Sequence, residues 1–160
     1  MSARKEPRGE SSTKEQRPEG AAAERLALLH RRFGWTSLFA WMCLGLVLEL
    51  AHGFKLGGYL LDPLRREFLT LAHFHGALLS VLNLVYVRWA EAPSLGATQR
   101  LHASRALVAG TVLMPLGFLL GGIQHYEGDP GLGIFLAPIG ALALLYCVLI
   151  QLRAAWKPER

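Results

Sequence analysis

Four long runs of apolar residues dominate the chain. Each run is about as long as the roughly 20 residues that an α-helix needs to cross about 30 Å of hydrocarbon. Polar residues do not recur within the runs at every third or fourth position, as they would along the helices of a soluble bundle. The pattern therefore predicts an all-α fold, a four-helix transmembrane bundle. The predicted helices cover about 33–51, 68–87, 106–123 and 132–152.

The first 20 residues have a different composition from the rest of the chain. They are charged, rich in proline and glycine, and nearly devoid of apolar side chains. Such a segment cannot bury enough apolar surface to offset the entropy lost on ordering. We therefore expect residues 1–20 to form a disordered cytoplasmic tail and residues 21–160 to form the transmembrane domain, which begins with a short interfacial helix from Ala21.

Charge near the ends of the apolar runs predicts the orientation of the chain. The positive-inside rule places the flanks that are richer in Lys and Arg in the cytoplasm. Here that rule predicts a multi-pass protein of a bacterial inner membrane with both termini cytoplasmic. Attraction to anionic lipid accounts for the net charge of +5, so the bilayer is the expected partner and no nucleic acid is needed. The basic residues on the cytoplasmic side are Arg25, Arg31, Arg32, Arg88, Arg100, Arg105, Arg153, Lys157 and Arg160, against Lys55, Arg65 and Arg66 on the other side.

An internal similarity suggests that the bundle is a duplicated two-helix unit. A shift of 72 positions aligns the first helix with the third, and the helices that follow them share Gly-Ala-Leu. Each of these following helices is preceded by an Asp-Pro pair, suited to the N-cap and first position of a helix. Two such units would be parallel halves related by an axis along the membrane normal. The residues aligned by the shift of 72 include His30 with His102, Met42 with Met114 and Gly45 with Gly117. The shared Gly-Ala-Leu corresponds to a shift of 64, which aligns His73 with Ala137, and the pairs are Asp62-Pro63 and Asp129-Pro130.

Histidines at the predicted outer end of the bundle are the strongest sign of function. Ionisable side chains are costly within a bilayer and usually mark a functional site. A carboxylate, Glu49, lies one helical turn from His52 on the same face. By contrast, His30 and His102 lie in the Arg-rich cytoplasmic flanks, and we expect both to be interfacial. The candidate binding residues are His52, His73, His75, His125 and Glu49.

Helical geometry limits how many of these histidines can act together. His73 and His75 are two residues apart, so they point about 200° apart around a helix. Unless the helix is distorted, at most one of them can join the other candidates, and the sequence does not say which. His75 shares its face with Asn83 and Tyr86, which together form a polar line directed inward.

The chemistry of such a set is open to several interpretations. Imidazoles from different helices are ligands for haem and for copper or zinc, so haem b or copper is a candidate cofactor, with His52, His75 and His125 as the metal ligands. Glu49 would orient a ligand imidazole, complete a coordination shell or pass protons. A quinone headgroup would instead take hydrogen bonds from these groups without a metal.

Two other classes of function fit the same residues. In one, the protein is a structural or assembly subunit, with a membrane-protein partner or as a homo-oligomer, whose histidines only bridge helices. In the other, Glu49 and the polar line of His75, Asn83 and Tyr86 handle protons or a small solute. The chain has no Gly-x-Ser-x-Gly, no Gly-Lys-Ser/Thr and no His-Glu-x-x-His motif, which favours a protein that is not an enzyme.

Two sequence segments carry a resemblance to known families. The segments 30–35, His-Arg-Arg-Phe-Gly-Trp, and 70–79, Thr-Leu-Ala-His-Phe-His-Gly-Ala-Leu-Leu, resemble small uncharacterised bacterial membrane proteins with an Ala-His-x-His-Gly helix. They are also similar to the first two helices of haem-copper oxidase subunit I, in which a histidine of the second helix binds a low-spin haem. The resemblance covers about a third of the chain and implies that His73 or His75 is a haem ligand. This chain lacks the family's paired-histidine copper motif and its cross-linked tyrosine motif, so the resemblance does not imply oxygen reduction.

Overall fold

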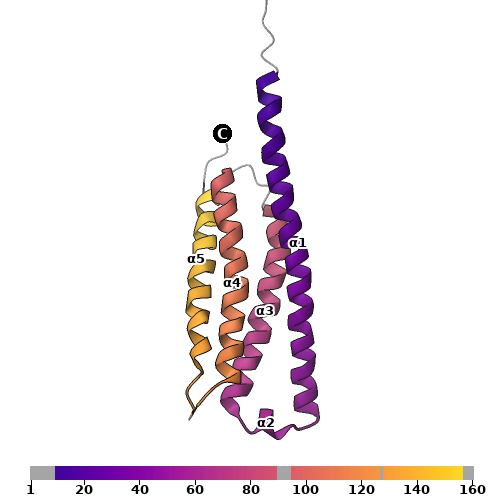
Figure 1. Ribbon diagram of the computed structural model, residues 1–160, viewed down its shortest axis with the longest axis vertical. Helices are drawn as coiled ribbons and strands as arrows, with labels where there is room; N and C mark the ends of the chain where they lie inside the picture. Colours follow the sequence, from indigo (N-terminus) through magenta and orange to yellow (C-terminus); the bar gives the residue numbers. More distant parts are fainter. Residues whose placement is uncertain (1–9, 90–94, 127, 157–160) are drawn as a thin grey trace, which may run out of the picture.

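Four long helices make up most of the chain in the computed structural model, which describes residues 10–89, 95–126 and 128–156. Each of the four is long and apolar enough to cross a membrane, so the predicted all-α bundle of membrane-spanning helices is confirmed. The first long helix begins, and the last one ends, at the same end of the bundle (Figure 1). The elements are α1 (Glu10–Gly53), α2 (Gly57–Leu60), α3 (Pro63–Trp89), α4 (Ala97–Ile123), the 3₁₀-helix η1 (Leu132–Phe135) and α5 (Leu136–Ala155).

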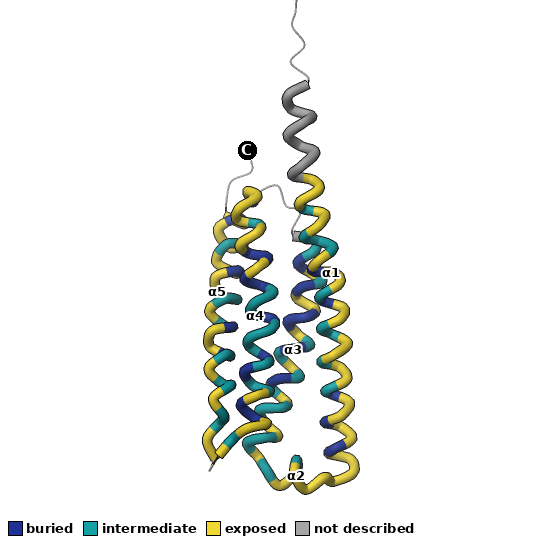
Figure 2. Tube along the Cα trace, in the orientation of Figure 1, coloured by how far each residue is buried: buried dark blue, intermediate teal, exposed yellow. Residues whose placement is uncertain are grey.

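The helices pack in an open row rather than a closed ring. The main contacts join α1 to α3, α3 to α4 and α4 to α5, and α1 approaches α4 only briefly. Within the described residues no Cα atom of α5 lies within 8 Å of a Cα atom of α1 or α3. The first and last helices of this row, α1 and α5, therefore leave broad surfaces exposed (Figure 2), and many of the exposed side chains are large and apolar. In a bilayer such surfaces face lipid tails, which are as apolar as the side chains themselves.

Glycines allow the neighbouring helices to approach closely, and they do so in the same way in both halves. A Cβ atom at Gly45 of α1 would collide with the ring of His73 on α3. In the second half, a Cβ atom at Gly117 of α4 would collide with Ala137 of α5. These two contacts join positions that the internal similarity aligns. Duplication stays a prediction, but it would produce this equivalence.

The two Asp-Pro pairs have different roles. Asp62 is the N-cap of α3, because its Oδ1 accepts a hydrogen bond of 2.9 Å from the backbone N–H of Arg65, as predicted. The same prediction is wrong for Asp129. Its backbone exchanges hydrogen bonds of 2.9 and 3.1 Å with Tyr126 in a tight turn, and the following 3₁₀-helix begins later, with Gly131 at its N-cap.

The N-terminal segment is helical farther back than expected. Helix α1 starts at Glu10, so the part of the predicted tail from residue 10 onward is helical in the structure. The interfacial helix expected from Ala21 is continuous with the first membrane span, which extends over Gly20–Gly53. Residues 1–9 of the predicted tail lie outside the described residues.

Candidate functional site

The histidines predicted to form one belt lie in three separate surroundings. His52 and His73 line a shared cavity of about 510 Å³ together with Glu49. This cavity lies between α1 and α3 at the end of the bundle that carries α2 (Figure 1). His75 lies instead against α4, and His125 contacts the start of α3. Of the two histidines on α3, it is therefore His73 that joins Glu49 and His52.

His73 is fixed in position by the neighbouring helix. Its Nδ1–H donates a hydrogen bond of 2.8 Å to the backbone carbonyl of Trp41, and its ring packs against Gly45. Because a carbonyl only accepts, this bond places the ring proton on Nδ1 and leaves a lone pair on Nε2. No side chain or backbone group in the described parts of the chain donates a hydrogen bond to that Nε2. A backbone carbonyl that orients one imidazole nitrogen in this way is the usual support of an imidazole that binds a ligand through the other.

The lining of the cavity is partly apolar and partly polar. Leu46 and Leu48 of α1 contribute apolar side chains, while Tyr59 and Thr70, whose hydroxyl donates to the Arg66 carbonyl, line it together with His52. Tyr59 and Thr70 also line a second cavity of about 440 Å³, which reaches the start of α3 at Pro63. Glu49 and His52 are exposed, near the end of α1. A volume of this size with a few polar groups is typical of a small-molecule site.

His75 belongs to the interface between α3 and α4. Its Nδ1–H donates a hydrogen bond of 2.9 Å to the carbonyl of Leu71, one turn earlier in the same helix. Its ring stacks on Phe118 of α4, with 5.0 Å between the centroids and 29° between the planes. The prediction that His73 and His75 point in different directions is therefore confirmed, since one faces α1 and the other faces α4.

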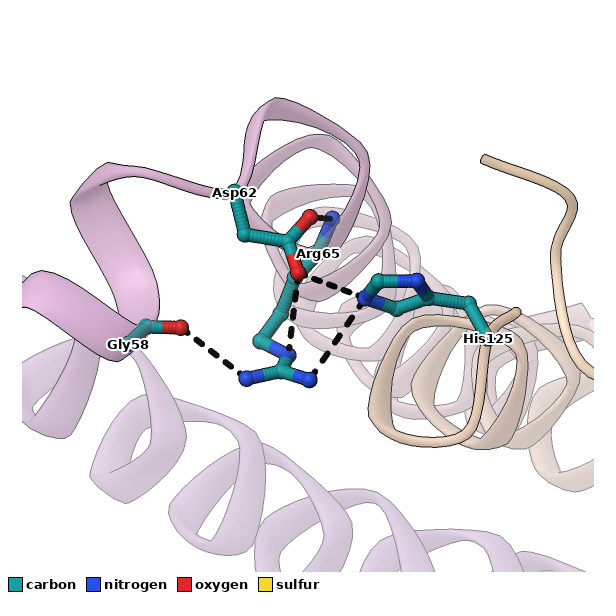
Figure 3. A network of polar contacts seen from close by, with 4 residues as sticks. All are labelled: Gly58, Asp62, Arg65 and His125. Atoms are coloured by element: carbon teal, nitrogen blue, oxygen red, sulfur yellow. Dashed lines mark hydrogen bonds and ion pairs between the residues drawn. The ribbon is translucent and has the colours of Figure 1, made fainter. Parts of the chain in front are cut away.

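His125 connects the end of α4 to the start of α3 (Figure 3). Its Nε2–H donates a hydrogen bond of 2.6 Å to Oδ2 of Asp62, and the Nε atom of Arg65 lies 3.7 Å from the same oxygen. Arg65 also donates a hydrogen bond of 2.9 Å to the carbonyl of Gly58. The pKa of the Asp62 carboxyl is lowered, chiefly by the hydrogen bond from the backbone N–H of Arg65 and then by His125. This cluster joins the chain segment between α1 and α3 to the segment that follows α4, and it is separate from the cavity.

The predicted metal ligands are not gathered at one point. His52, His75 and His125 lie respectively in the cavity, against Phe118 and beside Asp62. Across residues 10–89, 95–126 and 128–156, no group of three or more His, Cys, Asp or Glu side chains is placed to hold a metal ion. His52 and His125 lie at the ends of α1 and α4, whereas His75 lies about 18 Å into α3, against a different neighbour. Copper binding stays a prediction without a ligand set in this structure.

His30 is the residue whose role the sequence analysis missed. The expectation that it is interfacial is wrong, because it is completely buried where α1, α3 and α4 meet. Its Nδ1–H donates a hydrogen bond of 2.7 Å to Oδ1 of Asn83, and its Nε2 accepts one of 2.8 Å from the hydroxyl of Ser104. Asn83 in turn donates a hydrogen bond of 2.8 Å to the hydroxyl of Thr111. The ring of Tyr86 lies 4.5 Å from that of His30, centroid to centroid.

A signal for this junction exists in the sequence. Ser104 and Thr111 are seven residues apart, hence on one face of α4, and Asn83 stands alone within an apolar run. Polar side chains buried within a bilayer need hydrogen-bond partners, and a histidine at the same depth of another helix is the natural one. His102, which aligns with His30 in the internal similarity, is exposed as expected, with its Nδ1 3.2 Å from the hydroxyl of Tyr146.

The arrangement thus offers two kinds of polar site. In the junction around His30, both ring nitrogens and the asparagine amide have hydrogen-bond partners within the bundle. In the cavity, Nε2 of His73 and the Glu49 carboxylate remain available to a ligand. Comparisons with protein-family models, curated proteins and solved structures find no match to this chain.

Proposed function

We propose that the protein is a membrane-embedded, non-catalytic subunit that binds haem b in the cavity between α1 and α3, with His73 as an axial ligand. One observation carries the proposal. The Trp41 carbonyl fixes the His73 ring and leaves its Nε2 without a hydrogen bond from the described residues, on a side chain that lines a cavity of about 510 Å³. Preparing one nitrogen in this way is what a ligand imidazole needs.

Haem suits this site better than a bare metal ion does. A copper or zinc ion needs three or four protein ligands, whereas haem supplies four equatorial nitrogens and asks for one or two axial side chains. His52, which lines the same cavity from α1, is the candidate for the second axial position. Glu49 would interact with a propionate-side water or with the His52 ring. The resemblance of segment 70–79 to the haem-binding helix of haem-copper oxidase subunit I supports the same choice.

The charge distribution supports a proposed orientation for this site. We propose that the end carrying both termini faces the cytoplasm of a bacterial cell, because Arg31, Arg32, Arg100 and Arg153 lie there. The cavity then lies toward the outer leaflet. A bound haem would be placed near the periplasmic face, away from the arginine-rich end.

Two histidine variants on one helix provide a matched test. The full chain is purified in detergent after expression with a haem precursor, and its visible spectrum and haem content are measured. We expect a Soret band in the wild type, its loss in His73→Ala and its retention in His75→Ala. Both histidines donate through Nδ1 to a backbone carbonyl, so only their direction differs. A wild-type protein without a Soret band, or an equal loss in the two variants, would contradict the proposal.

A second role is favoured by two other histidines, which bridge helices. His30 joins α1 to α3 and α4, and His125 joins α4 to the start of α3. We propose that these two residues serve to hold the bundle together and bind no ligand. The haem measurement distinguishes the two roles. Removal of a bridging histidine should lower the stability of the fold, whereas removal of the haem ligand should abolish the Soret band.

A further inference from the structure

The second cavity, of about 440 Å³, continues the proposed haem cavity toward the start of α3. The two cavities share His52, Tyr59 and Thr70 as lining residues, so they adjoin one another. A ligand that is larger than one cavity can therefore extend into the other. The residues that line only the second cavity are Pro63, Arg66, Glu67 and Leu71.

Arg66 brings a positive charge to the second cavity. It stands seven residues before His73 on α3, hence on the same face of the helix and about 10.5 Å nearer its start. Toward the described residues its guanidinium donates one hydrogen bond, of 3.2 Å from Nη1 to the carbonyl of Leu60. Most of its five N–H groups are thus not used by those residues. A planar fork of this kind binds a carboxylate through two parallel hydrogen bonds.

The neighbouring arginine points in another direction. Arg65 donates a hydrogen bond to the carbonyl of Gly58, and its Nε atom lies 3.7 Å from Oδ2 of Asp62 (Figure 3). Of the described residues that line the two cavities, Arg66 is the single arginine. Successive residues of a helix are about 100° apart, so only one of the two arginines follows the face of His73. The pair therefore carries equal charge, with one member directed to the second cavity and the other to the cluster around Asp62.

The lining of the haem cavity indicates which way a bound haem points. Toward the middle of the membrane span, α1 contributes Met42, Gly45 and Leu46 to this lining. Haem b carries two propionate groups that are ionised at neutral pH, and an ionised carboxylate among apolar side chains within a bilayer is costly. The second cavity adjoins the haem cavity at the opposite, outward end. A haem held by His73 therefore directs its propionates toward the second cavity.

We propose that Arg66 binds a propionate of this haem and so fixes the orientation of the cofactor in its cavity. Arg66 acts in this way only when haem is bound, so this role rests on the proposed function of the cavity. Glu67 lines the second cavity as well, and its negative charge opposes a carboxylate there. The second cavity is thus a carboxylate-binding subsite in which Arg66 attracts the propionate and Glu67 weakens the attraction.

Titration of the full chain in detergent with haem b and with haem dimethyl ester, followed by absorbance, tests this subsite. The ester keeps the iron and the macrocycle but lacks the negative charges, so the ratio of the two affinities measures the contribution of the carboxylates. Arg66→Gln should lower this ratio about fivefold, the upper value for an ion pair near a protein surface. Arg65→Gln removes the same charge from the adjacent position and should leave the ratio unchanged. Because all proteins are compared in one detergent, the different partition of the two haems into micelles cancels.

Two further measurements separate an electrostatic role of Arg66 from a structural one. Glu67→Gln removes the opposing charge and should raise the ratio by a similar factor. Salt screens charges near a protein surface, so about 1 M salt should bring the ratio of the wild type close to that of Arg66→Gln. A purely structural role of Arg66, through its hydrogen bond to the Leu60 carbonyl, would instead weaken the binding of both haems alike and leave the ratio unchanged.

The variants distinguish a failure of this subsite from a failure of the haem site. If the wild type and Arg66→Gln have the same ratio while His73→Ala loses both haems, the haem site is retained and the role of Arg66 is wrong. Equal changes of the ratio in Arg65→Gln and Arg66→Gln would also overturn that role, since any charge near this end of the bundle would then suffice. A wild type that binds neither haem contradicts the haem site and the subsite together.

Discussion

Helices α1 and α3 carry a polar site near each end, and the two sites differ in how fully their hydrogen-bonding groups are used. At one end His30 is completely buried, and both of its ring nitrogens have partners within the bundle. About 33 Å farther along α1, His52 and Glu49 are exposed beside a cavity, and His73 uses only one ring nitrogen. A buried polar group whose bonds are all made holds a fold together, whereas one with an unused acceptor beside a cavity is available to a ligand.

The position of α4 accounts for this difference. Near the termini α4 comes close enough to α1 for Ser104 to reach His30, so three helices close around the junction. Toward the other end the described neighbours of α1 are α3 and the short α2, and no third long helix covers the cavity. Histidines on one helix thus have different roles because their surroundings contain different numbers of helices.

The largest effect should come from breaking the closed junction. We expect His30→Ala to lower the free energy of unfolding by about 3 kcal/mol, because two interhelical hydrogen bonds of about 0.6–1.7 kcal/mol each are lost and a cavity is left. The measurement is equilibrium unfolding in mixed micelles with increasing dodecyl sulfate. His102→Ala, at the aligned but exposed position, is the control and should change stability by less than about 0.5 kcal/mol. Equal effects of the two variants would show that the buried network contributes nothing specific.

A smaller effect is expected when the support of the open site is disturbed. A Cβ atom at Gly45 would collide with the His73 ring, so Gly45→Ala should displace the imidazole from the Trp41 carbonyl. Loss of such a supporting contact costs about 10- to 100-fold in the affinity of a bound metal centre, and we expect at least a tenfold weaker haem affinity. Haem titration followed by absorbance measures this change.

The control for this prediction is another glycine on the same helix. No atom lies within 4 Å of a Cβ built at Gly53, so Gly53→Ala should bind haem as the wild type does. If Gly45→Ala binds haem with unchanged affinity, His73 is not the ligand. A wild type that binds no haem at all contradicts the proposed haem site itself, and the spectroscopic test would already have shown this.

The features that the sequence predicted correctly depend on local geometry. Membrane spans follow from runs of apolar residues, and the divergence of His73 and His75 follows from a rotation of about 100° per residue. The burial of His30 depends instead on Asn83 and Ser104, which lie 53 and 74 residues away along the chain. Charge near His30 favoured an interfacial position, and the isolated polar residues of α3 and α4 become its partners only through the packing of three helices. The predicted metal ligands His52, His75 and His125 are not gathered in this structure for a related reason, since each contacts a different part of the bundle.

The Asp-Pro pairs show the same limit on a smaller scale. Both were expected to cap helices, and the local sequence does not distinguish them. At Asp62 the chain enters α3 directly, so its carboxylate reaches the N–H of Arg65. At Asp129 the backbone is already used in a turn with Tyr126, in which Gly128 adopts a φ of 90°. A loop that turns back on itself before the helix begins removes the aspartate from the capping position.

The smallest expected effect concerns Asp62, whose cluster is partly exposed and lies outside both sites of the comparison. Its pKa is lowered from the ordinary 3.8 by the Arg65 N–H and by His125, so the cluster stabilises the fold above that value and the stabilisation is lost as the pH falls through the lowered pKa. The melting temperature of the wild type in detergent should therefore decline below about pH 4. Asn caps a helix as well as Asp does but does not titrate, so Asp62→Asn should have a shallower decline while Asp62→Ala is less stable at every pH. Other carboxylates titrate in the same range in all three proteins, and only the difference between the wild type and Asp62→Asn reports on Asp62. Parallel curves for these two proteins would mean that His125 holds α4 to α3 without help from the charge of Asp62.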